Sequence, residues 1–196
     1  MKPEPPSVQP PGGSPRIENE AELATRARGG DRVAFGQLVE RFAPQARRVA
    51  RAVLQDPHDA DDAAQDAFLA ALMKLDQYDP RRPFGPWLMR IVANAATDRR
   101  RRRTVRQVEP LAPELTGGGP RPDREAEQSA LGDRLRAALA ELPERRRIAV
   151  VLFDVEGYSH SEIAQILGIP EGTVRSEVFH ARRALRPLLQ DWREHE

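Results

Sequence analysis

A group of carboxylates near the middle of the chain is the first candidate for chemistry. Asp59, Asp61 and Asp62 form a D-x-D-D pattern, and carboxylate oxygens are the ligands that hard divalent cations prefer. On a helix, however, consecutive residues are rotated by about 100°, so Asp61 points away from both neighbours. No histidine or glutamate completes the set. The sequence therefore predicts no metal site.

Catalytic arrangements are also missing from the sequence. The chain has no cysteine, which excludes disulfides, thiolate zinc sites and cysteine nucleophiles. Its histidines, His58, His160, His180 and His195, are scattered, and none lies beside a Ser–Asp pair. The glycine triplet at 117–119 lacks the strand, the following helix and the lysine of a phosphate-binding loop. We therefore expect no enzyme activity and no cofactor.

The helix expected after Asp56 has an unusual exposed face. Its alanines share one side, and the opposite side combines carboxylates with an amide and large apolar groups: Asp59, Asp62, Gln65, Asp66, Leu69 and Met73. A solvated face would not normally present leucine and methionine beside three carboxylates. Such a stripe suits docking onto a basic helix of another protein. A solvated face with two stray apolar residues is the alternative.

A basic helix with neighbouring aromatic residues is expected next. Its outward face holds Arg90, Asn94, Thr97 and Arg101, and arginines fill positions 99–103. Such a run favours binding to a polyanion, because each neutralised phosphate releases counterions. The aromatic residues Tyr78, Phe84 and Trp87 lie close by and could stack on unpaired bases. Phe84 and Trp87 also lie on the apolar stripe of the helix, which favours a role in the core.

The C-terminal part has the outline of a helix-turn-helix. Ser159 and Glu162 have capping-box spacing, Gly168 suits a helix C-cap, and a longer basic helix follows. On that helix the inner face holds Val174, Val178, Ala181 and Leu185. The other side and its edges present residues suited to phosphates and guanine edges, namely Arg175, Ser176, Phe179, His180, Arg182 and Arg183. An ordinary basic helix on the surface of a bundle is the alternative.

The elements that must position these residues are all helical. The chain has 196 residues, and its 31 basic and 30 acidic side chains give a net charge of +1. This length allows one domain or two small ones. No segment alternates as a strand would, and no run of about 18 apolar residues could cross a membrane. The N-terminus has no apolar core of a secretory signal, so we expect a cytoplasmic protein without membrane insertion.

The expected fold class is all-α, with two small helical domains joined by a flexible linker. The predicted boundaries are a disordered Pro-rich tail at 1–18, a helical domain at 19–105, a linker at 106–127 and the helix-turn-helix domain at 128–192. Pro44 should kink or split the helix that begins near Asp31. The apolar periodicity also predicts that Leu72, Leu135 and Val155 are buried.

The order of these parts resembles the sigma factors of bacterial RNA polymerase. The compact two-domain form is similar to the extracytoplasmic-function group of the sigma-70 family. The matching stretches are DADDAAQDAFLAAL, FGPWLMRIVANAATDRRRR, LPERRRIAVVL and YSHSEIAQILGIPEGTVRSEVFHARRALR. They lie within residues 31–103 and 131–189.

The resemblance implies a protein that binds the polymerase core enzyme, directs it to specific promoters and promotes DNA opening. The acidic and apolar helix face from Asp59 to Met73 matches the segment that docks on the polymerase largest subunit. Arg90, Asn94 and the loop at 79–84 match the part that holds the minus-ten element as a single strand, with the arginine run at 99–103 on the backbone. The helix carrying Arg175 to Arg183 matches the reader of the duplex minus-35 element. Proteins of this kind are commonly held inactive by an anti-sigma factor.

Some features depart from the family pattern or leave other functions open. Glu177 and His180 stand where basic residues are frequent, and Glu177 either weakens phosphate attraction or pairs with a neighbouring arginine. A plain DNA-binding regulator is one alternative; it would need a ligand pocket or a dimer interface in the first domain. A scaffold that only docks polymerase is the other, and Arg175 and Arg183 on the groove-facing side argue against it.

Overall fold

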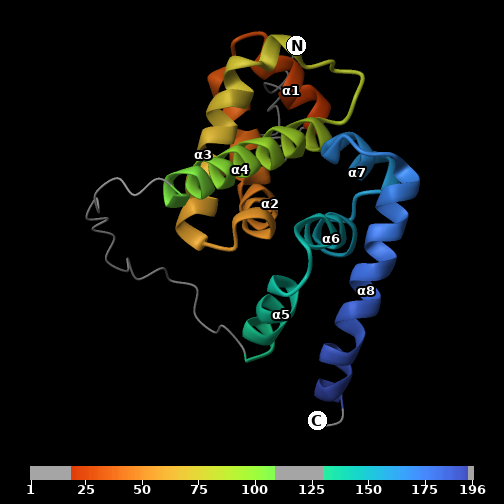
Figure 1. Ribbon diagram of the computed structural model, residues 1–196. Helices are drawn as coiled ribbons and strands as arrows, with labels where there is room; N and C mark the ends of the chain where they lie inside the picture. Colours follow the sequence, from red (N-terminus) through yellow and green to blue (C-terminus); the bar gives the residue numbers. More distant parts are fainter. Residues whose placement is uncertain (1–18, 109–129, 194–196) are drawn as a thin grey trace, which may run out of the picture.

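The computed structural model of the chain describes residues 19–108 and 130–193. Within these two ranges every regular element is helical and no strand is present, which confirms the all-α class. Figure 1 shows one group of helices from the N-terminal part above a second group from the C-terminal part. The predicted Pro-rich tail and most of the predicted linker lie outside the described residues.

The N-terminal helical unit begins earlier than the periodicity indicates. It contains α1 (Glu20–Arg28), α2 (Arg32–Leu54), α3 (Pro57–Met73), the short 3-10 helix η1 (Leu75–Gln77) and α4 (Phe84–Val108). The helix α1 was not predicted, although Asn19 and Glu22 form a capping box at its start. Asp31 and Asp56 cap α2 and α3 as expected, because each side chain accepts a hydrogen bond from an N–H group of the first turn.

The C-terminal helical unit contains the expected helix-turn-helix. Its elements are α5 (Ala130–Ala140), α6 (Glu144–Val150), a π-helical turn η2 (Val151–Val155), α7 (His160–Leu167) and α8 (Glu171–Arg193). Ser159 and Glu162 form the predicted capping box of α7. Gly168 ends α7 in the left-handed region at φ 66°, where a residue without a Cβ is not strained. The tight turn that follows sets α8 against α7.

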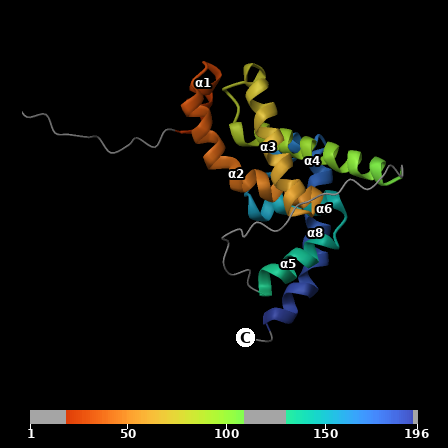
Figure 2. The same ribbon diagram turned by 90° about the vertical axis from the view of Figure 1, so that its left-hand side faces the viewer.

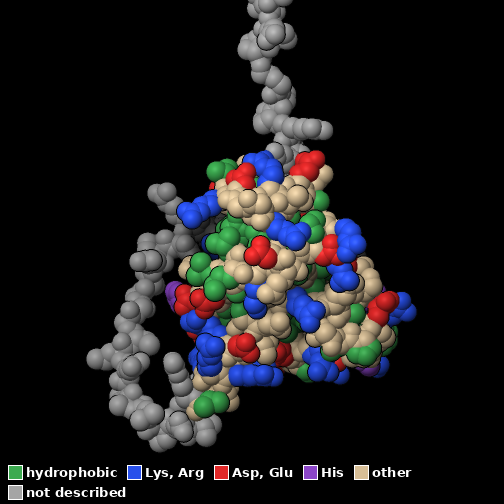
Figure 3. Space-filling view, turned by 90° about the horizontal axis from the view of Figure 1, so that it is seen from above, with side chains coloured by type: hydrophobic (Ala, Val, Ile, Leu, Met, Phe, Trp, Pro, Cys, Tyr) green, Lys and Arg blue, Asp and Glu red, His purple; other side chains and the backbone are tan. Residues whose placement is uncertain are grey.

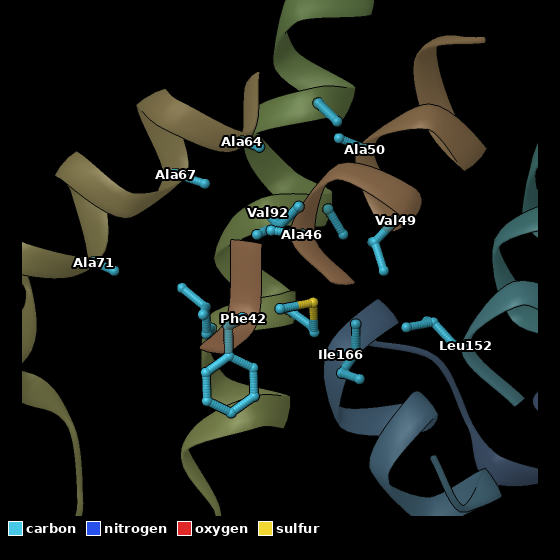
Figure 4. Packing of buried hydrophobic residues seen from close by; sticks show 14 of the residues in the cluster. Phe42, Ala46, Val49, Ala50, Ala64, Ala67, Ala71, Val92, Leu152 and Ile166 are labelled. Atoms are coloured by element: carbon cyan, nitrogen blue, oxygen red, sulfur yellow. The ribbon is translucent and has the colours of Figure 1, made fainter. Parts of the chain in front are cut away.

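Alanines on α3 allow close packing in the N-terminal helical unit. The face that α3 turns to α2 and α4 holds Ala60, Ala63, Ala64, Ala67 and Ala71, all buried. Small side chains at a contact bring helix axes nearer to one another. Larger residues such as Leu38, Phe42 and Leu88 fill the space between α2 and α4. Figure 4 shows the alanines of α3 directed toward this core.

Four expectations about local structure need correction. Pro44 does not split α2, which continues from Arg32 to Leu54; Pro44 is exposed, so water can reach the acceptor that its missing N–H leaves. Val155 is 55% exposed because the π-helical turn has more residues per turn than an α-helix and rotates it off the buried face. Leu135 and Leu72 are 36% and 47% exposed. Leu72 follows buried Ala71 and lies one turn beyond Leu69, on the outer side of α3.

Candidate functional site

The outer face of α3 ends in an exposed apolar patch. Leu69 is 63% exposed and Met73 is 84% exposed, so the predicted combination of apolar side chains and carboxylates is present on the surface. Leu72 lies three residues after Leu69 and extends the patch, which we call the α3 apolar patch (Leu69, Leu72 and Met73). Exposed large apolar groups that share one helix face are typical of a surface that contacts another protein.

The carboxylates on the same face are paired with arginines of α4. Arg99 places Nε 2.9 Å from Asp59 Oδ1 and Nη2 2.6 Å from Asp62 Oδ2, and its Nη1 lies 3.9 Å from Asp66 Oδ2. Arg103 Nη1 adds a contact of 2.9 Å with Asp59. Burial alone lowers the pKa of Arg99, but the pairs with Asp59 and Asp62 outweigh it and raise the pKa. These pairs, which sequence reasoning missed, link the outer face of α3 to α4.

Most of the predicted outward face of α4 is open to solvent. Arg90, Asn94 and Arg101 are exposed and lie on one helix, so one surface of α4 can present them together. Thr97 is half-buried, and its hydroxyl donates to the carbonyl of Ala93 at 2.8 Å. The structure therefore leaves three of the four predicted side chains free of the core, while the Thr97 hydroxyl is engaged by its own helix.

Tyr78 and Phe84 are not available for base stacking, which corrects the expectation for these two rings. Tyr78 is 2% exposed and Phe84 is 1% exposed. Their ring centroids are 5.3 Å apart in an edge-to-face contact, and Trp87 lies 5.2 Å from Tyr78. Burial, with smaller effects from two nearby carboxylates, raises the pKa of Tyr78 to about 12. The two rings pack against one another and against α2, so their faces are not free to stack on bases.

The buried aromatic residues instead hold the loop before α4 in shape. The hydroxyl of Tyr78 donates to the carbonyl of Arg82 at 2.5 Å. Asp79 and Arg81 form a two-point pair, with Arg81 Nη2 2.9 Å from Asp79 Oδ2. Hydrogen bonds from the side chain and backbone of Arg81 lower the pKa of Asp79 to about 2. The loop therefore presents the exposed side chains of Arg81 and Arg82 beside the start of α4.

The outer face of α8 carries most of the residues predicted for duplex DNA. The inner residues Val174, Val178, Ala181 and Leu185 are buried, as predicted. Ser176, Phe179, His180 and Arg183 are exposed, with Phe179 at 62%. The rings of Phe179 and His180 touch edge to face, with centroids 5.4 Å apart. The helix therefore offers an exposed aromatic pair together with arginine donors on one side.

The flanks of α8 hold charge pairs that orient its arginines. Arg175 pairs with Glu171 one turn earlier at 2.5 Å. Arg182 pairs with Asp154 of η2 and lies 4.9 Å from the ring of Phe153. Glu177 pairs with Arg146 of α6 at 3.2 Å. Glu177 therefore faces α6, as the pairing alternative predicts, and its charge is compensated within the protein.

Two further expectations concern what the described residues lack. Across residues 19–108 and 130–193, no three histidine or acidic side chains are placed to hold a metal ion. In the same ranges no helix is both long and apolar enough to cross a membrane. Seen from above in Figure 3, basic and acidic side chains are interspersed with hydrophobic ones on that face.

Two family models match the two helical units. The model described as Sigma-70 region 2 matches residues 38–106, which run from α2 to α4. The model described as Sigma-70, region 4 matches residues 132–185, which include the helix-turn-helix. Together with the all-helical fold and the exposed faces of α3, α4 and α8, these matches define a sigma factor of the sigma-70 family.

Known proteins match the chain along most of its length. The ECF RNA polymerase sigma factor SigM of Mycobacterium tuberculosis is 40% identical over 178 residues, covering 90% of this chain and 88% of that protein. A structure of CnrH, a sigma factor known from Cupriavidus metallidurans, in complex with the cytosolic domain of CnrY shares 32% identity and a TM-score of 0.66, over 88% of this chain and 97% of that chain. The sigma factor RpoE in complex with the anti-sigma factor NepR from Bartonella quintana shares 28% identity and a TM-score of 0.63, over 80% and 96%.

The chain therefore belongs to the extracytoplasmic-function sigma factors of bacterial RNA polymerase. As a sigma factor, it binds the polymerase core enzyme and directs it to specific promoters for transcription initiation. Sigma factors are not themselves catalysts; polymerase carries out RNA synthesis.

Proposed function

We propose that the outer face of α3 is the surface by which this sigma factor docks on the polymerase core enzyme. The observation that carries the proposal is the α3 apolar patch, whose members are 47–84% exposed beside the carboxylates of Asp62 and Asp66. An apolar patch gives affinity by burial, and the adjoining carboxylates select a basic partner surface. Exposed ion pairs are worth only about 0–1 kcal/mol each, so polymerase cations can replace Arg99 at low cost.

The outer face of α4 and the loop before it are proposed to capture the minus-ten element after the strands separate. Arg90, Asn94 and Arg101 supply exposed donors, and Arg81 and Arg82 extend the basic surface at the start of the helix. Capturing extruded bases recovers a few kcal/mol per base of the energy spent on unstacking. The buried aromatic residues take no part in this contact in the proposal; they hold the loop in place.

The outer face of α8 is proposed to read the minus-35 element in the major groove. Arg175 and Arg183 are exposed donors suited to guanine edges or phosphates, and Phe179 offers an apolar contact to a thymine methyl group. The pairs of Glu177 with Arg146 and of Arg182 with Asp154 support a fixed orientation of this helix. Because α8 reads the duplex and α4 binds a single strand, the two DNA contacts have different chemistry.

The partners and location follow from the same assignment. The RpoE protein similar to this chain forms a complex with an anti-sigma factor, and we propose that this chain too is held by an anti-sigma partner. Promoter DNA and polymerase are in the cytoplasm of a bacterium, so we propose that the chain acts there. We also propose that, as a sigma factor, it has no catalytic activity of its own.

The docking assignment is tested by reversing charge on the outer face of α3. Asp62→Arg combined with Asp66→Arg is expected to abolish co-elution with core polymerase on a sizing column without DNA, with an unchanged helical circular dichroism spectrum. The matched control is Glu40→Arg combined with Glu141→Arg, which changes the charge by the same amount at exposed positions on α2 and after α5. Normal co-elution of the Asp62 and Asp66 variant would refute the assignment.

A further inference from the structure

The helix α4, which carries the proposed minus-ten face, begins without a capping side chain of its own. The helices α1, α2, α3 and α7 each follow a residue whose side chain accepts a hydrogen bond from the first turn. The helix α4 instead follows Pro83, and no side chain at positions 83–86 has a hydrogen-bond acceptor. The N–H groups of a first helical turn have no partner within their own helix, so α4 depends on an acceptor from another part of the chain or from water.

The first residue of α1 supplies this acceptor. Glu20 Oε1 accepts a hydrogen bond from the N–H group of Gly85 at 2.7 Å, across 65 positions of the sequence. Gly85 is buried, and a buried N–H group without a partner is costly. The carboxylate also lies at the positive end of the α4 dipole, where negative charge is stabilising. Glu20 therefore caps α4 in place of a local side chain.

The helix α1 is held in the position that this contact requires. Its side chains Leu23, Ala24 and Ala27 are buried, and it packs against α2, η1 and α4. In its last turn Arg26 donates to Asp31 Oδ2 from Nε at 3.1 Å and from Nη2 at 2.7 Å, and Asp31 is the N-cap of α2. Figure 1 and Figure 2 both show α1 beside the loop that leads into α4. One end of α1 is thus linked to α2 and the other to α4.

The same carboxylate lies near the tyrosine that holds the loop before α4. Burial is the main cause that raises the pKa of Tyr78 to about 12, and the negative charge of Glu20 adds to it. The Tyr78 hydroxyl donates to the carbonyl of Arg82 at 2.5 Å, three residues before Gly85. The loop at 79–83 therefore ends at two polar anchors, one from Tyr78 and one from Glu20.

Gly85 itself is closely surrounded by side chains. A Cβ at this position would lie 3.2 Å from the ring of Phe42 and 2.8 Å from Oη of Tyr158, a residue of the C-terminal helical unit. The Tyr158 hydroxyl donates to Gln45 of α2 at 3.0 Å, so this donor is engaged elsewhere. The start of α4 thus contacts both helical units, and Glu20 supplies the acceptor for its buried N–H group.

We propose that Glu20 is a positioning residue for promoter opening. By capping α4 from α1, it fixes the loop at 79–83 and the first turn of α4 in the conformation that captures the minus-ten strand. A preorganised loop loses less conformational entropy when it binds. The family model for region 2 matches residues 38–106, so it does not include Glu20. The positioning role rests on the proposed minus-ten contact, whereas the cap itself does not.

The cap is tested by hydrogen exchange of the Gly85 amide, measured by NMR on the free full-length protein. Glu20→Ala removes the acceptor and is expected to speed exchange at Gly85 severalfold, because local opening becomes easier. Glu20→Gln keeps an acceptor oxygen and is expected to retain most of the protection. Glu22→Ala is the matched control, because Glu22 lies in the same turn of α1 and its side chain accepts from the Asn19 N–H group. It is expected to leave exchange at Gly85 unchanged.

The positioning role is tested with the complex of the full chain and core polymerase. The probe is a fluorescent single-stranded oligonucleotide selected from a random pool with the parent complex. Loss of a capping acceptor lowers the fraction of competent loop, so Glu20→Ala is expected to bind this strand about fivefold to tenfold more weakly with normal co-elution with core polymerase. Glu20→Gln is expected to stay within about threefold of the parent, and Glu22→Ala is expected to bind as the parent does.

A shorter carboxylate tests the reach of the cap without changing charge. Glu20→Asp keeps an acidic residue in the first turn of α1 but shortens the side chain by one methylene group. It is expected to speed exchange at Gly85 and to weaken strand binding in the same direction as Glu20→Ala. Circular dichroism is measured on each variant, and Glu20→Asp carries the test if Glu20→Ala loses helicity.

The possible failures can be distinguished from one another. Unchanged exchange at Gly85 in Glu20→Ala and Glu20→Asp overturns the cap. Parent-like strand binding in these variants, while Asn94→Ala weakens it, overturns the positioning role and leaves the proposed minus-ten face standing. An equal loss of binding in Glu22→Ala also overturns it, because weakening of α1 as a whole would then be the cause. Parent-like binding in Asn94→Ala as well refutes the minus-ten face and the positioning role together, while exchange at Gly85 still reports on the cap.

Discussion

Replacement of Arg147 by methionine is expected to cost about 2–4 kcal/mol of the free energy of unfolding. The guanidinium makes two short hydrogen bonds, to the carbonyls of Ala52 and Leu142 at 2.5 and 3.0 Å. Hydrogen bonds from a charged donor contribute about 1.5–3 kcal/mol each, so their loss alone costs roughly 3–6 kcal/mol. Methionine also removes a buried charge, which returns part of this cost.

The buried charge of Arg147 is itself unfavourable, and its removal offsets part of the lost hydrogen bonding. Burial, and to a smaller extent the charge of Arg100, lowers the pKa of Arg147, so the fold disfavours the cation before its hydrogen bonds are counted. The substitution leaves the carbonyls of Leu142, just after α5, and of Ala52, near the end of α2, without this buried donor. We therefore expect the loss of hydrogen bonds to exceed the relief of the buried charge.

Urea unfolding followed by circular dichroism measures this difference. Arg145→Met is the matched control, because Arg145 is exposed on the same helix and surface substitutions usually change stability by less than about 0.5 kcal/mol. Arg147→Lys keeps the charge but loses the planar fork, so it is expected to be destabilised as well. Equal midpoints for Arg147→Met and Arg145→Met would show that the bridging hydrogen bonds contribute nothing net.

Three further predictions address the DNA surfaces and the buried phenols. Arg175→Ala is expected to weaken binding to the cognate minus-35 duplex by about 1–3 kcal/mol if it pairs with guanine; unchanged fluorescence anisotropy titrations would reject that role. Asn94→Ala is expected to leave polymerase binding normal and to impair opening, and permanganate reactivity equal to that of the parent would count against it. Burial raises the pKa of Tyr78 to about 12 and also raises that of Tyr158, so the fold favours the protonated phenols. Stability that is complete below pH 10 should fall as the pH rises from about 10 toward 12, and an absorbance titration midpoint near 10 in the native protein would contradict this.

Local sequence rules were sufficient for most of the secondary structure. Caps such as Asp31, Asp56 and Ser159 satisfy N–H groups only a few residues away, so their effect is readable from spacing alone. The same holds for the inner face of α8 and for the exposed Leu69 and Met73 on α3. The helix α1 was missed because its nine residues bury only three small or medium side chains, too few for a periodic signal. Its capping box at Asn19 was the available clue.

Positions next to irregular backbone were predicted less well. The π-helical turn at 151–155 rotates Val155 away from the core, and nothing in the apolar spacing indicates the extra residue per turn. Tyr78 and Phe84 were placed beside the DNA surface because they are near it in sequence. Whether an aromatic ring faces solvent or the core depends on which helices surround it, and here α2 and α4 enclose both rings.

The sequence by itself determined the class of fold, the helix-turn-helix and the composition of the three exposed faces, because helix periodicity and capping act over a few residues. Only the tertiary structure decided which charges meet. Arg99 pairs with Asp59, which is 40 positions away in the sequence, and Arg48 pairs with Glu156, which is 108 positions away. At such separations the spacing of residues does not indicate which of the many arginines and carboxylates of this chain will pair. The contact between the two helical units was not predictable for the same reason. It depends on the shapes of two assembled cores, and no single segment of the sequence carries that information.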